Sequence, residues 1–219
     1  MEKRSIKIGS YDTAAHGWTL TAFKLTDPEV KENYVEKTGG DGSWDLTTAM
    51  TGGIPRYKIR TLTVNLECSK GNRSEREDLI NEMVNELDGL EWPIVLPDRP
   101  DHYLQTRVRV AVDYSDLAHA AVTITAKCEP WFYNSRESIV ELTATEATQT
   151  VYLRNGGRRA VVPVLTVNGQ VNLAFELYTT QIETGVYEWS PLLLTTGLHA
   201  LEYSGNGTLQ ITYREAVLR

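Results

Sequence analysis

The chain has 219 residues, of which 41% are hydrophobic and 23% charged, and its formal net charge is −7. This composition is that of a folded globular protein, long enough for one large domain or two small ones. The acidic balance argues against nucleic acid and against an anionic membrane surface as partners, because both attract basic surfaces. No apolar run resembles a signal peptide or approaches the roughly 18 residues of a membrane span, so we expect no secretion signal and no membrane insertion.

A long polar segment, Thr38 to Gly53, lies between two strand patterns. Loops of this length in compact domains are usually functional or disordered. Its oxygen-bearing residues Asp41, Ser43, Asp45 and Thr47 alternate as calcium ligands can, but the mid-loop glycine and distal glutamate of an EF-hand are missing. The favoured interpretation is a polar turn whose side chains bond their own backbone, so no metal site is expected here.

Alternation of apolar and polar residues predicts strands with one buried and one wet face. The apolar positions fall in three runs: Leu62, Val64, Leu66 and Cys68; Val108, Val110 and Val112; and Val122, Ile124, Ala126 and Cys128. Residues Asp113 to Leu117 predict the hairpin turn between the last two runs. Both cysteines lie on the apolar parity, so we expect buried thiols and neither a disulfide nor a zinc site.

One segment predicts a helix, from Ser74 to Asp88. Ser74 and Glu77 have the spacing of a capping box, and Gly89 supplies a stop signal at the other end. The apolar side chains recur at helical spacing, at Leu79, Ile80, Met83, Val84 and Leu87. No second helix is evident, so this stripe is expected to pack on a sheet.

Composition changes near residue 136. The part from 136 to 219 contains neither lysine nor aspartate, and short strand patterns alternate there with glycine turns such as Asn168-Gly169 and Gly205-Asn-Gly207. Such spacing is typical of a small sandwich or barrel. We therefore expect domains at 1–135 and 136–219, with a boundary at Asn134 to Arg136.

The common signatures of catalysis are missing. The four histidines are scattered, and His199 with Glu202 would point to opposite sides of a strand. The sequence has no nucleophile elbow and no phosphate-binding loop. We expect no catalytic residues, no cofactor and no enzyme activity.

Several landmarks occur in a characteristic order. They are Gly39-Gly-Asp-Gly-Ser-Trp-Asp-Leu46, Tyr57-x-x-Arg60, the capped helix, Trp92-Pro-Ile-Val-Leu-Pro-Asp98, Tyr103 with Arg107, Cys128-Glu-Pro-Trp131, Tyr203-Ser-Gly-Asn-Gly207 and Tyr213-Arg-Glu215. Together they resemble the distal tail proteins of long-tailed phages, the Dit family. Thr106 departs from the glycine that often precedes the arginine in that family.

The resemblance implies a mainly β protein, with an N-terminal β-sandwich carrying one helix and a C-terminal galectin-like β-sandwich. It implies a hexameric ring at the virion tail tip, made in the host bacterial cytoplasm, between the tail tube protein and a tail-associated baseplate or fibre protein. We expect the long polar loop, or the hairpin that carries it, to reach a neighbouring protomer. The interface residues expected on this basis are Gly40, Asp41, Trp44, Asp45, Tyr57 and Arg60.

Two other functions stay open. The C-terminal half could be a carbohydrate-binding module for the host wall, with Trp189 as a sugar contact, because a sugar site needs an exposed aromatic ring beside polar groups. Trp189 could equally lie in the core. A hydrolase, the third possibility, requires a cleft with clustered carboxylates.

Overall fold

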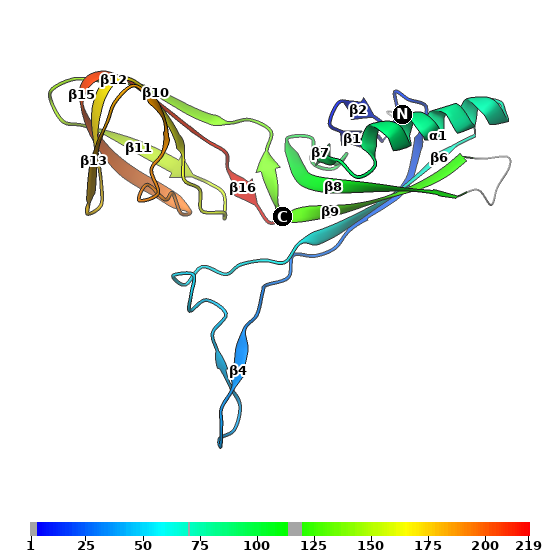
Figure 1. Cartoon of the computed structure of the whole chain (residues 1–219), viewed down its shortest axis with the longest axis horizontal. Coiled ribbons are helices and arrows are strands. Elements are labelled where there is room, and N and C mark those ends of the chain that lie inside the picture. The colour runs from blue at the N-terminus through cyan, green and yellow to red at the C-terminus, as the bar shows by residue number, and fades with distance from the viewer. Residues whose placement is uncertain (1–3, 70, 114–119) are drawn as a thin grey trace. The chain divides into compact units, whose positions relative to one another are not determined.

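A computed structural model describes residues 4–69, 71–113 and 120–219 (Figure 1). It is mainly β with one helix, α1, in the described residues, which confirms the expected fold class. The chain divides into two compact units, residues 1–130 and 131–219. The division falls inside one long strand, and the boundary expected at Asn134 to Arg136 stays a prediction.

The first unit is built on an antiparallel sheet. Its strands are β1 (Lys7–Ile8), β2 (Tyr11–Asp12), β3 (Thr19–Leu25), β6 (Arg60–Cys68), β7 (Glu91–Val95), β8 (His102–Asp113) and β9 (Ala120–Asn134), the last of which runs on into the second unit. They lie side by side in the order β2-β1-β7-β8-β9-β6-β3. The apolar positions of β6 and β9 are buried as predicted, because opposite residues such as Val64 and Ile124 share one face. Of the turn predicted at Asp113 to Leu117, Asp113 ends β8 and residues 114–117 lie outside the described part.

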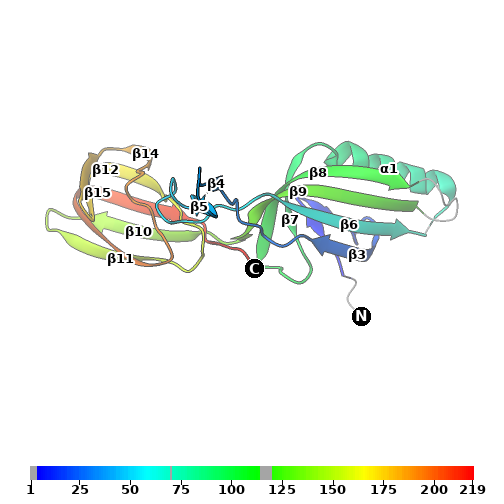
Figure 2. The ribbon, with the colours of Figure 1, turned by 90° about the horizontal axis from the view of Figure 1, so that it is seen from below.

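Helix α1 (Arg73–Leu87) covers one face of this sheet (Figures 1 and 2). Ile80, Met83 and Leu87 are buried against it, while Leu79 and Val84 are half-buried. The predicted apolar stripe therefore holds α1 on the sheet, because burying each such side chain stabilises the fold by about 2 kcal/mol.

The predicted cap of α1 at Ser74 is wrong. The N-cap is Asn72, whose Oδ1 accepts the Glu75 amide at 3.0 Å while the Glu75 carboxylate accepts the Asn72 amide at 2.7 Å. Asn72 and Glu75 have the same spacing as Ser74 and Glu77, so the sequence offers two capping boxes. The earlier box adds residues to the helix and leaves Glu77 to pair with Arg73 at 2.9 Å.

Replacing the true cap should weaken the first unit. Asn72→Ala removes the acceptor for the Glu75 amide, and we expect a loss of about 1 kcal/mol in the free energy of unfolding. Ser74→Ala is the matched control, because Ser74 is not the cap, and it should change the unfolding midpoint little. Urea denaturation followed by circular dichroism measures both. A larger effect at Ser74 than at Asn72 would contradict the assignment.

Both cysteines are buried free thiols, as predicted, in β6 and β9. Burial raises the pKa of Cys128 to about 11, and its thiol donates to the Ala126 carbonyl. The thiolate is the reactive form, so Cys128 should not react with an aromatic disulfide reagent at pH 8 in the native protein. Full reaction is expected only in denaturant. Rapid modification of Cys128 in the folded chain would contradict this burial.

The second unit holds one bent antiparallel sheet of six strands. Its strands are β10 (Ser138–Ala144), β11 (Gln149–Asn155), β12 (Val164–Phe175), β13 (Tyr178–Ile182), β14 (Gly185–Glu188) and β15 (Gly197–Tyr213). The last strand, β16 (Ala216–Val217), lies outside this sheet and pairs with the C-terminal end of β9. Strands β12 and β15 pair at the centre; β10 and β11 share the outer edge of β15, and β13 and β14 share that of β12. The sheet curls around its own core, which includes Leu165, Leu173, Leu201 and Ile211 (Figure 2).

Two predicted glycine turns in this unit are not turns. Asn168-Gly169 lies within β12 and Gly205-Asn-Gly207 within β15, and Gly169 is directly opposite Gly207. A Cβ atom at Gly207 would lie 2.3 Å from the Asn168 carbonyl oxygen. Glycine is needed here because the two backbones approach too closely for a side chain.

Helix α1, the one helix in the described part of the chain, is not long and apolar enough to cross a membrane.

Candidate functional site

The long polar segment belongs to an arm that leaves the first unit between β3 and β6. We define the arm as residues 27–59; it contains the two-stranded hairpin β4 (Tyr34–Glu36) and β5 (Ser43–Asp45) (Figure 1). In Figure 1 this hairpin points away from the sheet of its own unit. The burial pattern shows no buried residue anywhere in the arm.

The base of the arm is fastened to the sheet. Arg60 is 4% exposed, and its Nε donates to the Thr26 carbonyl at 2.7 Å. The Thr26 hydroxyl in turn accepts the amide of Thr61 at 2.9 Å. Further out, the Lys58 amide donates to the Glu29 carbonyl, and the side chains of the same two residues form an ion pair at 3.2 Å. The arm therefore starts from a fixed position on the sheet.

The arm carries large apolar side chains that the rest of the described chain leaves exposed. Trp44 is 60% exposed and Met50 93%. The other exposed hydrophobic residues of the arm are Tyr34, Val35, Leu46 and Ile59. The ammonium of Lys37 lies 4.9 Å from the centre of the Trp44 ring, which is a cation–π contact. Exposed apolar side chains gathered on one segment are typical of interaction surfaces.

Polar hydrogen bonds form a turn where β5 ends, at the end of the hairpin opposite its tip. Asp45 Oδ1 accepts the Thr47 amide at 2.9 Å, and the hydrogen bonds from the Thr47 side chain and amide lower the pKa of Asp45. The Leu46 amide donates to the Asn33 carbonyl across the hairpin. The described residues contain no group of three or more histidine, cysteine or acidic side chains placed to hold a metal ion.

The structure gathers four of the expected interface residues on one exposed hairpin: Gly40, Asp41, Trp44 and Asp45. Tyr57 lies nearer the base of the arm, where it is half-buried and forms an isolated β-bridge with Val30. Arg60 lies inside the unit as an anchor, away from the exposed hairpin. The assignment of all six to an interface stays a prediction.

Sequence reasoning missed several apolar residues of this surface, among them Tyr34, Val35 and Met50. Val35 lies opposite Trp44 in the hairpin. The Asn-Tyr-Val run before the loop was the available signal, but a strand of three residues is too short to show alternation.

Trp189 does not form an exposed platform. It is half-buried and packs against the core of the second unit beside Tyr187. Its ring therefore serves packing there, and the possible sugar contact at Trp189 gains no support from its position.

The fold resembles that of a solved phage hub protein, the Dit protein (gp19.1) of phage SPP1. That protein is described as a paradigm of the hub adsorption apparatus in phages that infect Gram-positive bacteria. This chain matches it with 14% identity and a TM-score of 0.70, over 97% of this chain and 99% of that one. The chain thus shares the fold of SPP1 Dit along nearly its whole length.

Two structures of the phage p2 baseplate in its activated conformation, one with strontium and one with calcium, also match. Identities are 9% and 10%, TM-scores 0.45 and 0.43, and coverage is 96% and 95% of this chain against 98% and 97% of those chains. No protein-family model and no curated protein matches the sequence.

Proposed function

We propose that this chain is a structural hub protein of a phage tail tip, in which copies of the chain join head to tail into a closed ring. The single observation that carries the proposal is the arm, which is anchored at its base and has no buried residue of its own. The shared fold with SPP1 Dit supports the same role.

The energetics of the arm favour a contact between protomers. Ordering each backbone residue costs about 1–2 kcal/mol, and an isolated two-stranded hairpin is at best marginally stable. Trp44, Tyr34 and Met50 have no core of their own to offset that cost. Burying them on a neighbouring copy supplies the missing stabilisation, and tryptophan and tyrosine are the residues that most often dominate such interfaces.

A reaching arm makes a heterologous contact, because it presents one surface while the surface that receives it lies elsewhere on the chain. Such contacts close into a ring when the rotation between copies closes. We propose six copies, with the tail tube protein on one side of the ring and a tail-associated baseplate or fibre protein on the other. The ring is a virion component, and its role is structural rather than catalytic.

Site-specific photo-crosslinking tests the arm contact. A photoreactive benzoylphenylalanine in place of Trp44 should yield covalent multimers of the chain on illumination. The same residue in place of Tyr178, which is 56% exposed in the second unit, is the matched control and should yield only background crosslinking. A crosslink from position 44 that maps to its own protomer would refute the contact.

A further inference from the structure

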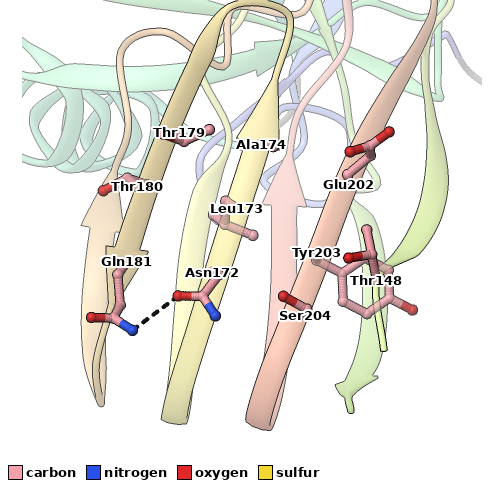
Figure 3. Close-up of a pocket in the computed structure, with 10 residues that line it drawn as sticks. All are labelled: Thr148, Asn172, Leu173, Ala174, Thr179, Thr180, Gln181, Glu202, Tyr203 and Ser204. Carbon is pink, nitrogen blue, oxygen red and sulfur yellow. Dashed lines mark hydrogen bonds between the residues drawn. The ribbon is translucent and has the colours of Figure 1, made fainter. Parts of the chain in front are cut away.

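A second surface lies on the bent sheet, far along the sequence from the arm. A hollow of about 510 Å³ opens on the solvent-facing side of β12, β13 and β15 (Figure 3). The side chains that line it include Thr148, Asn172, Thr179, Gln181, Glu202 and Ser204. The proposed function assigns no role to this hollow.

Strand register explains how the hollow forms. Asn172 of β12 lies directly opposite both Gln181 of β13 and Ser204 of β15, which makes one row of polar side chains. In the next row, Ala174 lies between Thr179 and Glu202. The side chains of paired residues stand on the same face, so the small Ala174 leaves space between larger neighbours.

The walls of the hollow are rich in neutral hydrogen-bonding groups. Gln181 Nε2 donates to Asn172 Oδ1 at 2.9 Å, which fixes both amides and leaves the Asn172 amide hydrogens and the Gln181 oxygen for a ligand. Figure 3 shows this pair on one side of the hollow and the Glu202 carboxylate on the other. Glu202 forms no ion pair among the described residues, and it is the single charged side chain among the ten that line the hollow.

An exposed aromatic ring lies one row further along the same face, beyond the row that contains Ala174 and Glu202. Tyr152 of β11 is 65% exposed and lies opposite Ala200, while Thr150 lies opposite Glu202. Residues two apart on a strand share a face, so Tyr152 stands on the same face as Glu202. A second small residue, Ala200, keeps the space beside the Tyr152 ring open.

We propose that this face binds a neutral saccharide, with the Tyr152 ring packing on the sugar and Asn172, Gln181 and Glu202 bonding its hydroxyl groups. An exposed ring beside convergent polar groups is the arrangement that orients such a ligand. A phosphate or anionic glycan is disfavoured, because the lining has a carboxylate and neither lysine nor arginine. The nearest cation on this face of β11 is Arg154, one further pair along the strand.

The test titrates the full-length chain with neutral trisaccharides, namely maltotriose, cellotriose and chitotriose, and follows binding by NMR. Pull-down on insoluble neutral polysaccharide is a separate arm that distinguishes a polymer ligand from a free oligosaccharide. Inorganic phosphate is the anionic probe. We expect at least one neutral probe to bind and to shift the side-chain amide signals of Asn172 and Gln181.

Two variants locate the binding. Tyr152→Ala should weaken it about tenfold, which is a loss of about 1.4 kcal/mol. Ala174→Gln should abolish it by filling the hollow. The control, Tyr178→Ala, removes a similarly exposed ring that pairs with buried Phe175 on the other face, and it should bind like the parent chain.

The proposal is overturned if no neutral probe binds at millimolar concentration, if phosphate alone binds, or if Tyr152→Ala and Ala174→Gln bind as the parent does. Thermal melting confirms that each variant is folded. The proposed ring is judged separately by the mass of the assembly, so a monomer that binds sugar would refute the ring and leave this site standing.

Discussion

Deletion of residues 40–50 will leave a folded chain that no longer associates with itself. The deleted segment holds β5, including Trp44 at 60% exposure, and Met50 at 93%, yet it contributes nothing to either core. Circular dichroism and the melting temperature should therefore stay close to those of the parent, while assembly is lost. Sedimentation velocity at matched concentrations measures both chains.

A single substitution sharpens this test. Trp44→Ala should weaken self-association about thirtyfold, the effect of losing roughly 2 kcal/mol at an interface hot spot. Tyr178→Ala is the matched control, because Tyr178 is similarly exposed but lies in the second unit. Equal effects of the two substitutions would show that general surface apolarity, and not the arm, drives association.

Substitution of Gly207 by valine will unfold the second unit. The new Cβ would lie 2.3 Å from the Asn168 carbonyl oxygen and 3.0 Å from Gly169 Cα, and both are backbone atoms that cannot rotate away. The clash falls on the β12–β15 pair at the centre of the sheet, where relief requires the strands to separate. We expect a loss well above the roughly 4 kcal/mol that marks exceptional single substitutions.

The first unit should survive this change, because α1 and its sheet bury a separate set of side chains. Limited proteolysis should then leave a fragment close to residues 1–130. Thr208→Val is the control: Thr208 is the exposed neighbour of Gly207, and its substitution should change stability by no more than about 0.5 kcal/mol. Loss of both units in Gly207→Val would show that they do not fold independently.

The elements most easily predicted were those with a clear inside and outside. Alternation located β6 and β9 because each has one face on a core, as Val64 and Ile124 show. The stripe through Met83 located α1 for the same reason, while the choice between caps at Asn72 and Ser74 could not be made from spacing that both satisfy.

Other features depended on contacts that a sequence does not display. Gly205 and Gly207 indicated a turn, but they serve a close approach of two strands whose pairing is set by the whole sheet. The sequence indicates the polar loop as a candidate contact, but it does not indicate the apolar surface of the arm. Tyr34 and Met50 are exposed and belong to no alternating or helical pattern of apolar residues. Predicting the hollow near Ala174 would require knowing the register of several paired strands.

The mass of the full-length chain in solution tests the central claim most directly. Native mass spectrometry across a range of concentrations should show one closed species of six copies growing at the expense of the monomer, without a ladder of larger assemblies. The deletion of residues 40–50 should remain at the monomer mass throughout. A parent chain that stays monomeric at every concentration, or a closed assembly that forms equally well without the arm segment, would contradict the account.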